Sequence, residues 1–258
     1  MQAIDKQHWA WLLTGICLVA LAWTGSLDAI SAGYVNDSLL DAGIIYATAR
    51  GINALVSALQ GTELDMWLVT FSIGELLDPI NDMIERFSGV MTVALASLVI
   101  QQLLLVMVSD VSVSVALTLL AVATVIAFMV GRLAGYQLLL KTFLVVALLR
   151  FSLALVLIAN LWVDQVFLAD SSSAEHAVMQ DFQGDLEQVD QTVRGEEGER
   201  SQLPGQFESL QEKFDAFVAN TLSLLGAMLL KAVLIPLLFL YAVLRLGRLL
   251  LSLTKPLA

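Results

Sequence analysis

Long apolar runs separated by polar stretches dominate the pattern of hydrophobic and polar positions along this chain. Four runs are long enough to cross the roughly 30 Å hydrocarbon core of a bilayer, which takes about 20 helical residues. They cover residues 90–108, 113–131, 142–162 and 222–243. An earlier run, at residues 9–25, has the length of a signal-peptide core as well as of a membrane anchor, and we favour the uncleaved anchor. The pattern therefore predicts five transmembrane helices.

The segment between the first two of these helices, residues 26–89, is more polar than the runs on either side. Residues 36–60 carry apolar side chains at helical spacing, interrupted by Asp41 and Arg50. This pattern fits a helix on the membrane surface, and it also fits a sixth crossing or a re-entrant passage inside a bundle. We favour the crossing or the re-entrant passage.

Two further elements are predicted before the second transmembrane helix. The β-prone stretch at residues 67–71 is bounded by glycines and predicts a short hairpin or an extended link. Asp78 and Pro79 are the residue types preferred at a helix N-cap and at the first helical position. We therefore expect an amphipathic helix that starts at Asp78 and continues directly into the second transmembrane helix.

A long acidic segment, residues 164–220, precedes the last transmembrane helix. Apolar side chains recur there every three or four residues in two stripes. The first stripe is Val178, Phe182, Leu186, Val189 and Val193, and the second is Leu203, Phe207, Leu210, Phe214 and Phe217. The polar run between them, residues 194–201, has the composition of a turn. We expect an antiparallel helical hairpin whose second helix continues into the last transmembrane helix, from about residue 204 to about 251.

The composition agrees with a membrane protein that has an acidic part outside the lipid. The chain has 258 residues, of which 58% are hydrophobic and 14% charged, and its mean hydropathy is +0.81. Such values are expected where lipid covers much of the surface. Residues 164–220 carry 13 acids against three bases, which accounts for most of the net charge of −11. We therefore expect no nucleic-acid partner.

Basic residues near the helix ends predict the orientation. They flank the turn between the third and fourth predicted helices and follow the last one: Arg132, Lys141, Arg245, Arg248 and Lys255. The positive-inside rule places both regions in the cytoplasm, so the acidic hairpin and a turn at Asp110 are external. If Lys6 is also cytoplasmic, residues 26–89 must contain one more crossing.

We thus expect a multi-pass protein of a cell membrane, of the bacterial inner-membrane type. The fold class is an all-α integral membrane protein with five to six transmembrane helices and an acidic extramembrane antiparallel helical hairpin. Its parts are an N-terminal transmembrane anchor (1–25), an amphipathic, re-entrant or surface segment (26–89), a three-helix transmembrane block (90–163), the acidic helical hairpin (164–220), and a C-terminal transmembrane helix with a basic tail (221–258).

Arg150 and Lys231 lie near the middle of predicted transmembrane helices that contain no carboxylate to neutralise them. A charge at that depth costs about 2.5–3.5 kcal/mol and requires water, a ligand or a counter-ion. Both residues could line a polar pathway, or each could form a buried ion pair with an acid elsewhere in the bundle or in a neighbouring subunit. For Lys231, a long side chain that reaches the interface is a third possibility.

Further polar residues complete the candidate set. Gln101 and Gln102 lie in the second predicted helix, where they either form interhelical hydrogen bonds or line the pathway. A solvated helix start explains Asp78, Asp82 and Glu85, which lack the spacing of an EF-hand calcium loop. If that segment enters the bundle, these acids are candidate counter-ions for the two buried bases.

Pro236 follows Lys231 by five residues. Proline has no backbone N–H, so it frees a carbonyl in the preceding helical turn. Inside lipid this carbonyl needs another hydrogen-bond partner. Pro236 therefore predicts either a packed bend or a kink that opens a polar cavity.

The sequence shows no pattern of catalytic chemistry. His8 and His176 are its only histidines, Cys17 is its only cysteine, and no HExxH, GxSxG, Walker or GxGxxG motif is present. We expect a protein that is not an enzyme and that has no cofactor and no metal. The preferred function is a channel-like or transport pathway for ions or small solutes in a homo-oligomer. The alternative is a non-catalytic structural or assembly subunit of a membrane complex, with membrane lipids and other membrane chains as partners.

Overall fold

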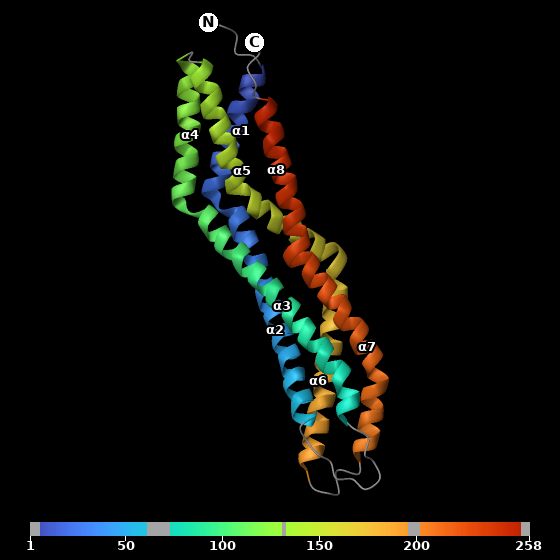
Figure 1. The fold of residues 1–258 in the computed structure, drawn as a ribbon. Helices are drawn as coiled ribbons and strands as arrows, with labels where there is room; N and C mark the ends of the chain where they lie inside the picture. Colours follow the sequence, from blue (N-terminus) through green and yellow to red (C-terminus); the bar gives the residue numbers. More distant parts are fainter. Residues whose placement is uncertain (1–5, 61–72, 131–132, 196–201, 254–258) are drawn as a thin grey trace. The chain divides into compact units, whose positions relative to one another are not determined.

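A computed structural model describes residues 6–60, 73–130, 133–195 and 202–253 (Figure 1). Every regular element in these ranges is helical, which confirms the predicted all-α class. The α-helices are α1 (Lys6–Thr24), α2 (Ser26–Gln60), α3 (Ile73–Ser109), α4 (Val111–Met129), α5 (Leu133–Val163), α6 (Ala169–Arg194), α7 (Leu203–Leu229) and α8 (Ile235–Leu253). Two π-helical segments, η1 (Asp164–Leu168) and η3 (Leu230–Leu234), connect α5 to α6 and α7 to α8. The β-prone stretch at residues 67–71 lies outside the described residues.

Within the described ranges, five helices are long and apolar enough to cross a membrane, judged by length and composition. They are Ser26–Gln60, Leu77–Ser109, Val111–Met129, Gly135–Val166 and Leu203–Leu249. The set includes the segment that the sequence left open, residues 36–60, whereas the N-terminal run contributes the shorter apolar stretch Leu13–Thr24. With 35 residues, α2 is about 50 Å long and exceeds the thickness of the hydrocarbon core.

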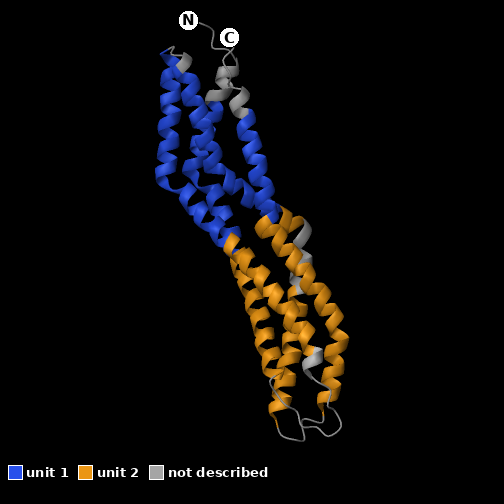
Figure 2. Cartoon of the chain, viewed as in Figure 1, with its two compact units in different colours: residues 1–37, 98–162, 234–258 blue, residues 38–97, 163–233 orange. Residues whose placement is uncertain are grey.

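The chain divides into two compact units (Figure 2). Unit 1 consists of residues 1–37, 98–162 and 234–258, and unit 2 consists of residues 38–97 and 163–233. The divisions fall inside helices rather than in loops. Each unit therefore takes parts of several long helices.

In unit 1, α1 lies along α4. A core cluster of Ala22, Leu117, Phe143, Ala147 and Phe151 joins these two helices to α5. The small alanines let the helix backbones approach one another closely, which is typical of helix contacts in membranes.

The chain does not reverse at Asp110, which corrects the predicted external turn between two separate crossings. Asp110 is the single residue between α3 and α4, whereas an antiparallel helix pair needs a loop of about two to five residues. Figure 1 shows α4 continuing onward from the end of α3. The Asp110 carboxylate accepts a hydrogen bond from the backbone N–H of Ser112 (2.8 Å) and so caps α4. The residue therefore marks a bend between consecutive helices.

In unit 2, α6 and α7 pack along the two apolar stripes. The ring of Phe182 stacks on that of Phe217, with 4.0 Å between the ring centroids. Most stripe positions are buried, whereas Val178, Phe207 and Phe214 are half-buried. The last helix also extends as predicted, since α7, η3 and α8 follow one another without a gap.

The surfaces of the two units differ in character. Among the described residues, the exposed large apolar side chains lie in unit 1, apart from Leu40, Ile44, Val93, Val166 and Leu222. Unit 2 holds 20 of the 24 acids and six of the 13 bases, a net charge of −14, whereas unit 1 has a net charge of +3. Unit 1 therefore has the more apolar surface, and unit 2 carries most of the negative charge.

Candidate functional site

Each of the two candidate bases forms an ion pair inside its own unit. Arg150 pairs with Asp28 in unit 1, and Lys231 pairs with Asp164 in unit 2. Both acids lie outside the apolar runs that predicted the transmembrane helices. The sequence pattern therefore identified the base of each pair but not the acid.

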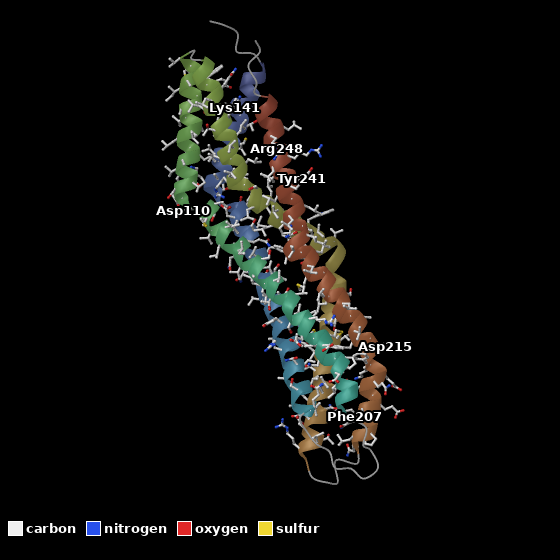
Figure 3. All side chains as sticks on the ribbon, in the orientation of Figure 1. Asp110, Lys141, Phe207, Asp215, Tyr241 and Arg248 are labelled. Carbon is white, nitrogen blue, oxygen red and sulfur yellow. The ribbon has the colours of Figure 1, made fainter. Side chains whose placement is uncertain are left out.

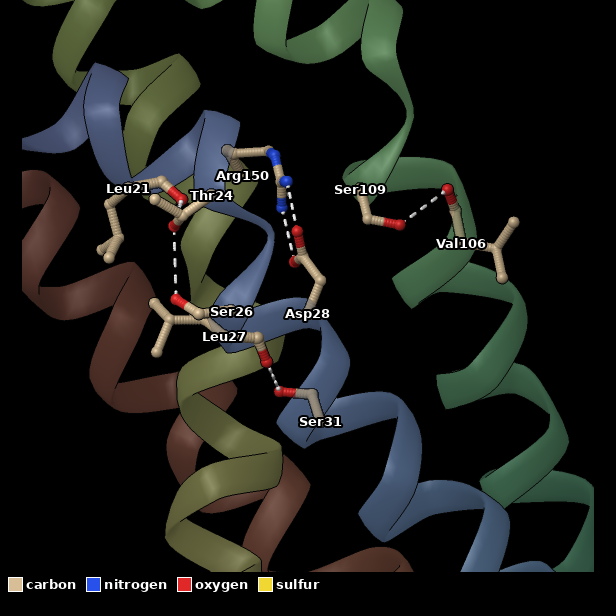
Figure 4. A network of polar contacts seen from close by, with 9 residues as sticks. All are labelled: Leu21, Thr24, Ser26, Leu27, Asp28, Ser31, Val106, Ser109 and Arg150. Atoms are coloured by element: carbon tan, nitrogen blue, oxygen red, sulfur yellow. Dashed lines mark hydrogen bonds and ion pairs between the residues drawn. The ribbon is translucent and has the colours of Figure 1, made fainter.

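The pair in unit 1 is bidentate (Figure 4). Nη1 of Arg150 donates to Oδ1 of Asp28 at 2.8 Å, and Nη2 donates to Oδ2 at 2.5 Å. Arg150 is 1% exposed, whereas the Asp28 side chain is 18% exposed. Two parallel charge-assisted hydrogen bonds fix the planes of both groups and neutralise a guanidinium that burial would otherwise make very costly.

A glycine places Asp28 opposite Arg150. Gly25 separates α1 from α2 with a φ of 62°, a conformation that residues with a Cβ rarely adopt. Helix α2 then begins at Ser26, so Asp28 falls in its first turn. A carboxylate in the first turn is also stabilised by the positive end of the helix dipole.

A second contact fixes the register of α2 against α5 one turn further on. The Ser31 hydroxyl lies within 2.7 Å of the Leu27 carbonyl on its own helix and within 3.2 Å of the Ala154 carbonyl on α5. Ser31 follows Asp28 by three residues on α2, and Ala154 follows Arg150 by four residues on α5. The two contacts are therefore one helical turn apart on each helix. Ser31 is completely buried, so this polar contact belongs to the interior of unit 1.

One donor of the guanidinium stays without a partner. Nε of Arg150 is buried and forms no hydrogen bond with any described residue. The Asp28 carboxylate binds the two terminal nitrogens and does not bind Nε. The guanidinium is thus neutralised but not fully hydrogen-bonded.

The pair in unit 2 joins the two π-helical segments. Nζ of Lys231, in η3, contacts Oδ1 of Asp164, the first residue of η1. The side chains are 11% and 27% exposed, so water reaches this pair more readily than it reaches Arg150. A π-turn inserts an extra residue into a helix and rotates the following side chains, and such turns often occur at functional sites.

The carbonyl freed by Pro236 has found a partner. Ala232 lies four residues before the proline, and its carbonyl accepts a hydrogen bond from the Ser97 hydroxyl of α3 at 2.6 Å. This contact supplies the hydrogen-bond partner that the freed carbonyl was expected to need. It lies next to Lys231, so a side-chain hydrogen bond and an ion pair both stabilise η3.

Breaking the Lys231 pair from one side is expected to destabilise the protein. Lys231→Met leaves the Asp164 carboxylate largely buried without a cation, which should lower the free energy of unfolding by about 2–4 kcal/mol. Lys231→Met/Asp164→Asn should recover most of that loss, because no orphan charge remains. Unfolding of the detergent-solubilised protein, followed by circular dichroism, measures both.

Lys213→Met is the matched control. Lys213 also contacts two carboxylates, those of Asp181 and Asp185, but its side chain is 44% exposed. Its loss should therefore cost less than about 1 kcal/mol. Equal losses for the two lysine variants would contradict a structural role for the pair between η1 and η3.

The remaining candidates do not join either pair. Gln101 is buried and Gln102 is half-buried, both on α3. Asp78, Asp82 and Glu85 are exposed on the same helix, and Asp78 accepts a hydrogen bond from the Gln60 amide at 2.8 Å. The hypothesis that these three acids neutralise the buried bases is wrong, because the acids that do so are Asp28 and Asp164.

The helical periodicity of α3 explains why those acids stay outside. Leu77, Ile80, Ile84 and Phe87 share one face of the helix and are buried in unit 2. The acids fall on the opposite face, which the same periodicity turns toward solvent. Helix α3 begins at Ile73, so the predicted start at Asp78 is wrong, and Pro79 lies inside the helix. The amphipathic periodicity of α3 is a sufficient explanation for the positions of the three acids.

The described residues offer little chemistry beyond these pairs. They contain no group of three or more His, Cys, Asp or Glu side chains that could hold a metal ion. The two buried bases found among them, Arg150 and Lys231, are both neutralised. Comparison of the chain with protein-family models, with curated proteins and with solved structures finds no match.

Proposed function

We propose that this chain is a non-catalytic subunit of a membrane complex. Unit 1 anchors the chain in the bilayer, and unit 2 presents an acidic surface to a partner that carries a basic one. The observation that carries this proposal is the separation of surface types, with exposed apolar side chains on unit 1 and a net charge of −14 on unit 2. Opposite surface charges raise association rates and select partners.

The acids of α7 are available for such a partner. Glu208, Glu212 and Asp215 are exposed, and none of them forms an ion pair with a described residue. Leu210 and Phe217, on the other face of the same helix, are buried and hold α7 against the rest of unit 2. Helix α7 thus displays several carboxylates whose charge no described residue neutralises.

The buried ion pairs favour an anchoring role over a conducting one. Arg150 and Lys231 are the residues that the sequence offered as the lining of a polar pathway. With a carboxylate bound to each, neither presents a net charge to a passing ion, and the Arg150 pair also ties α2 to α5. Paired charges of this kind are better suited to fixing how helices pack.

The orientation belongs to the same proposal. The start of α1, the end of α4, the start of α5 and the end of α8 lie at one end of unit 1 (Figure 1). Basic residues gather at or near these points in the sequence, which favours a cytoplasmic location for this end. The acidic segment at residues 164–220 then lies on the external side.

Purification from native membranes in mild detergent tests the proposal. We expect a stoichiometric partner with a basic surface that dissociates as ionic strength rises. Glu208→Lys/Glu212→Lys should weaken its retention by about tenfold or more, since two attractive contacts become repulsive. Ser209→Ala/Gln211→Ala, which changes exposed neighbours and keeps every charge, should bind like the parent.

A flux assay provides the opposing outcome. The purified chain alone, reconstituted in vesicles, should pass ions and small solutes no faster than empty vesicles do. Flux that disappears in Arg150→Gln or Lys231→Met, with no partner retained, would replace our proposal with the channel-like pathway. Partner binding that changes neither with ionic strength nor with the charges of α7 would overturn the proposed acidic docking surface.

A further inference from the structure

Unit 1 contains an apolar groove of about 440 Å³ between α1, α4 and α5. Aliphatic and aromatic side chains form most of its walls, with Ile16 and Val19 from α1, Val122 and Val125 from α4, and Leu140 and Phe143 from α5. Along α4 the groove extends from Thr118 to Phe128, which is about 15 Å at the rise of an α-helix. Its volume lies in the range of sites that bind small molecules.

The two threonine hydroxyls in the walls need no ligand. The Thr118 hydroxyl donates to the Ser114 carbonyl at 2.8 Å, and the Thr124 hydroxyl donates to the Leu120 carbonyl at 2.7 Å. Both bonds stay within α4. The groove is therefore suited to a ligand with a long apolar surface rather than to a polar solute.

One end of the groove has a different chemistry. Tyr136 lines it there and packs against Phe128, with 5.4 Å between the ring centroids. In the sequence Tyr136 lies between the bases Arg132 and Lys141, the second of which is half-buried on α5 (Figure 3). Tyrosine and basic residues at the end of a transmembrane helix are typical of the headgroup level, on the side where anionic lipids bind.

We propose that this groove binds one acyl chain of an anionic phospholipid, with the headgroup at the Tyr136 end. The apolar walls contact the chain, and Lys141, which follows Tyr136 by five residues on α5, attracts the headgroup. The site stands on unit 1 alone, so it does not depend on whether unit 2 binds a partner.

The length and the apolar walls of the groove suit an acyl chain. An acyl chain is narrow and flexible enough to follow the groove from Tyr136 toward Gly15, where α1 comes close to Phe143.

Photolabelling tests the site in the full chain. The protein is reconstituted in phosphatidylcholine vesicles containing a minor fraction of phosphatidylglycerol that carries a diazirine in its acyl chain. After illumination, mass spectrometry should find label concentrated on groove residues such as Ile16 and Val125. Ala20→Phe, which fills the groove from α1, should reduce this labelling by about tenfold, because overpacking excludes the chain.

Two further variants keep the result interpretable. Val125→Trp fills the groove from α4 and should act like Ala20→Phe. The test therefore does not depend on the correct folding of a single variant. Ala116→Phe adds the same bulk at an exposed position of α4 outside the groove and should label like the parent. Circular dichroism and gel filtration show that each variant is folded.

Three results would overturn the proposal. Label spread evenly over exposed apolar residues would indicate ordinary annular lipid. Groove labelling that both filling variants leave unchanged would show that the lipid lies elsewhere. Equal labelling by a diazirine phosphatidylcholine at the same concentration would remove the preference for an anionic headgroup.

Discussion

Arg150→Gln is expected to lower the free energy of unfolding by about 3–5 kcal/mol, the range for breaking a buried ion pair from one side. The variant leaves the Asp28 carboxylate facing α5 with its counter-ion removed, and the shorter amide cannot restore both hydrogen bonds. Titration of the protein in mixed micelles with sodium dodecyl sulfate, followed by circular dichroism, measures the change.

The decisive comparison is the double variant. Arg150→Gln/Asp28→Asn removes both charges and should recover a large part of the loss, giving a coupling energy of about 1–3 kcal/mol. Arg245→Gln is the control, because Arg245 is exposed on α8 and should change stability by less than about 0.5 kcal/mol. Additive losses at positions 28 and 150 would show that the two residues do not act as a pair.

The pair of Arg150 and Asp28 shows what hydropathy can predict from the sequence and what it cannot. Hydropathy places Arg150 inside an apolar run, and the cost of an isolated charge in lipid demands a counter-ion. Hydropathy does not identify that counter-ion, because Asp28 lies after the end of the first apolar run at Gly25. A single glycine with positive φ keeps α2 close enough to use its first turn, and no pattern in the sequence reports that angle.

The pair of Lys231 and Asp164 could not be predicted from the sequence for a related reason. The fourth apolar run ends at residue 162, and Asp164 follows it as the start of a loop would. In the structure the helix continues through η1, so this acid stays beside Lys231. The end of an apolar run shows where lipid-like composition ends, whereas backbone hydrogen bonds decide where the helix ends.

At Asp110 the sequence predicted a chain reversal, whereas the structure has only a bend between consecutive helices. Ser109, Asp110 and Ser112 have the composition of a turn, so the sequence favours a reversal. A single non-helical residue accommodates a bend, and the Asp110 side chain provides the cap that the new helix requires. The effect of Pro236 was predictable because it follows from covalent structure, whereas its partner Ser97 depends on tertiary packing.

The apolar stripes of the acidic segment were the most predictable part of unit 2, because helical spacing fixes which side chains share a face. Spacing does not fix the pairing across two helices. A pairing of Phe182 with Phe214 is compatible with the pattern, but the structure stacks Phe182 on Phe217 and leaves Phe214 half-buried. The register depends on how both helices meet the rest of unit 2.

That register leads to a prediction about single residues. Phe217→Ala should lower the free energy of unfolding by about 3–5 kcal/mol, because it empties a completely buried position and removes the stacking partner of Phe182. Phe214→Ala, three residues earlier on the same helix, removes the same atoms from a half-buried position and should cost about 1–2 kcal/mol. Thermal unfolding and limited proteolysis between α6 and α7 measure both variants.

A double-mutant cycle then tests the stacking itself. Phe182→Ala and Phe217→Ala should be coupled by about 0.5–1.5 kcal/mol, the energy of an aromatic pair beyond its buried area. Phe182→Ala and Phe214→Ala should be nearly additive, since Phe182 stacks on the other ring. The reverse order of coupling would move α7 by one helical turn against α6. Such a shift would also move Lys213 along α6 relative to Asp181 and Asp185, which its Nζ now contacts at 3.2 and 2.6 Å.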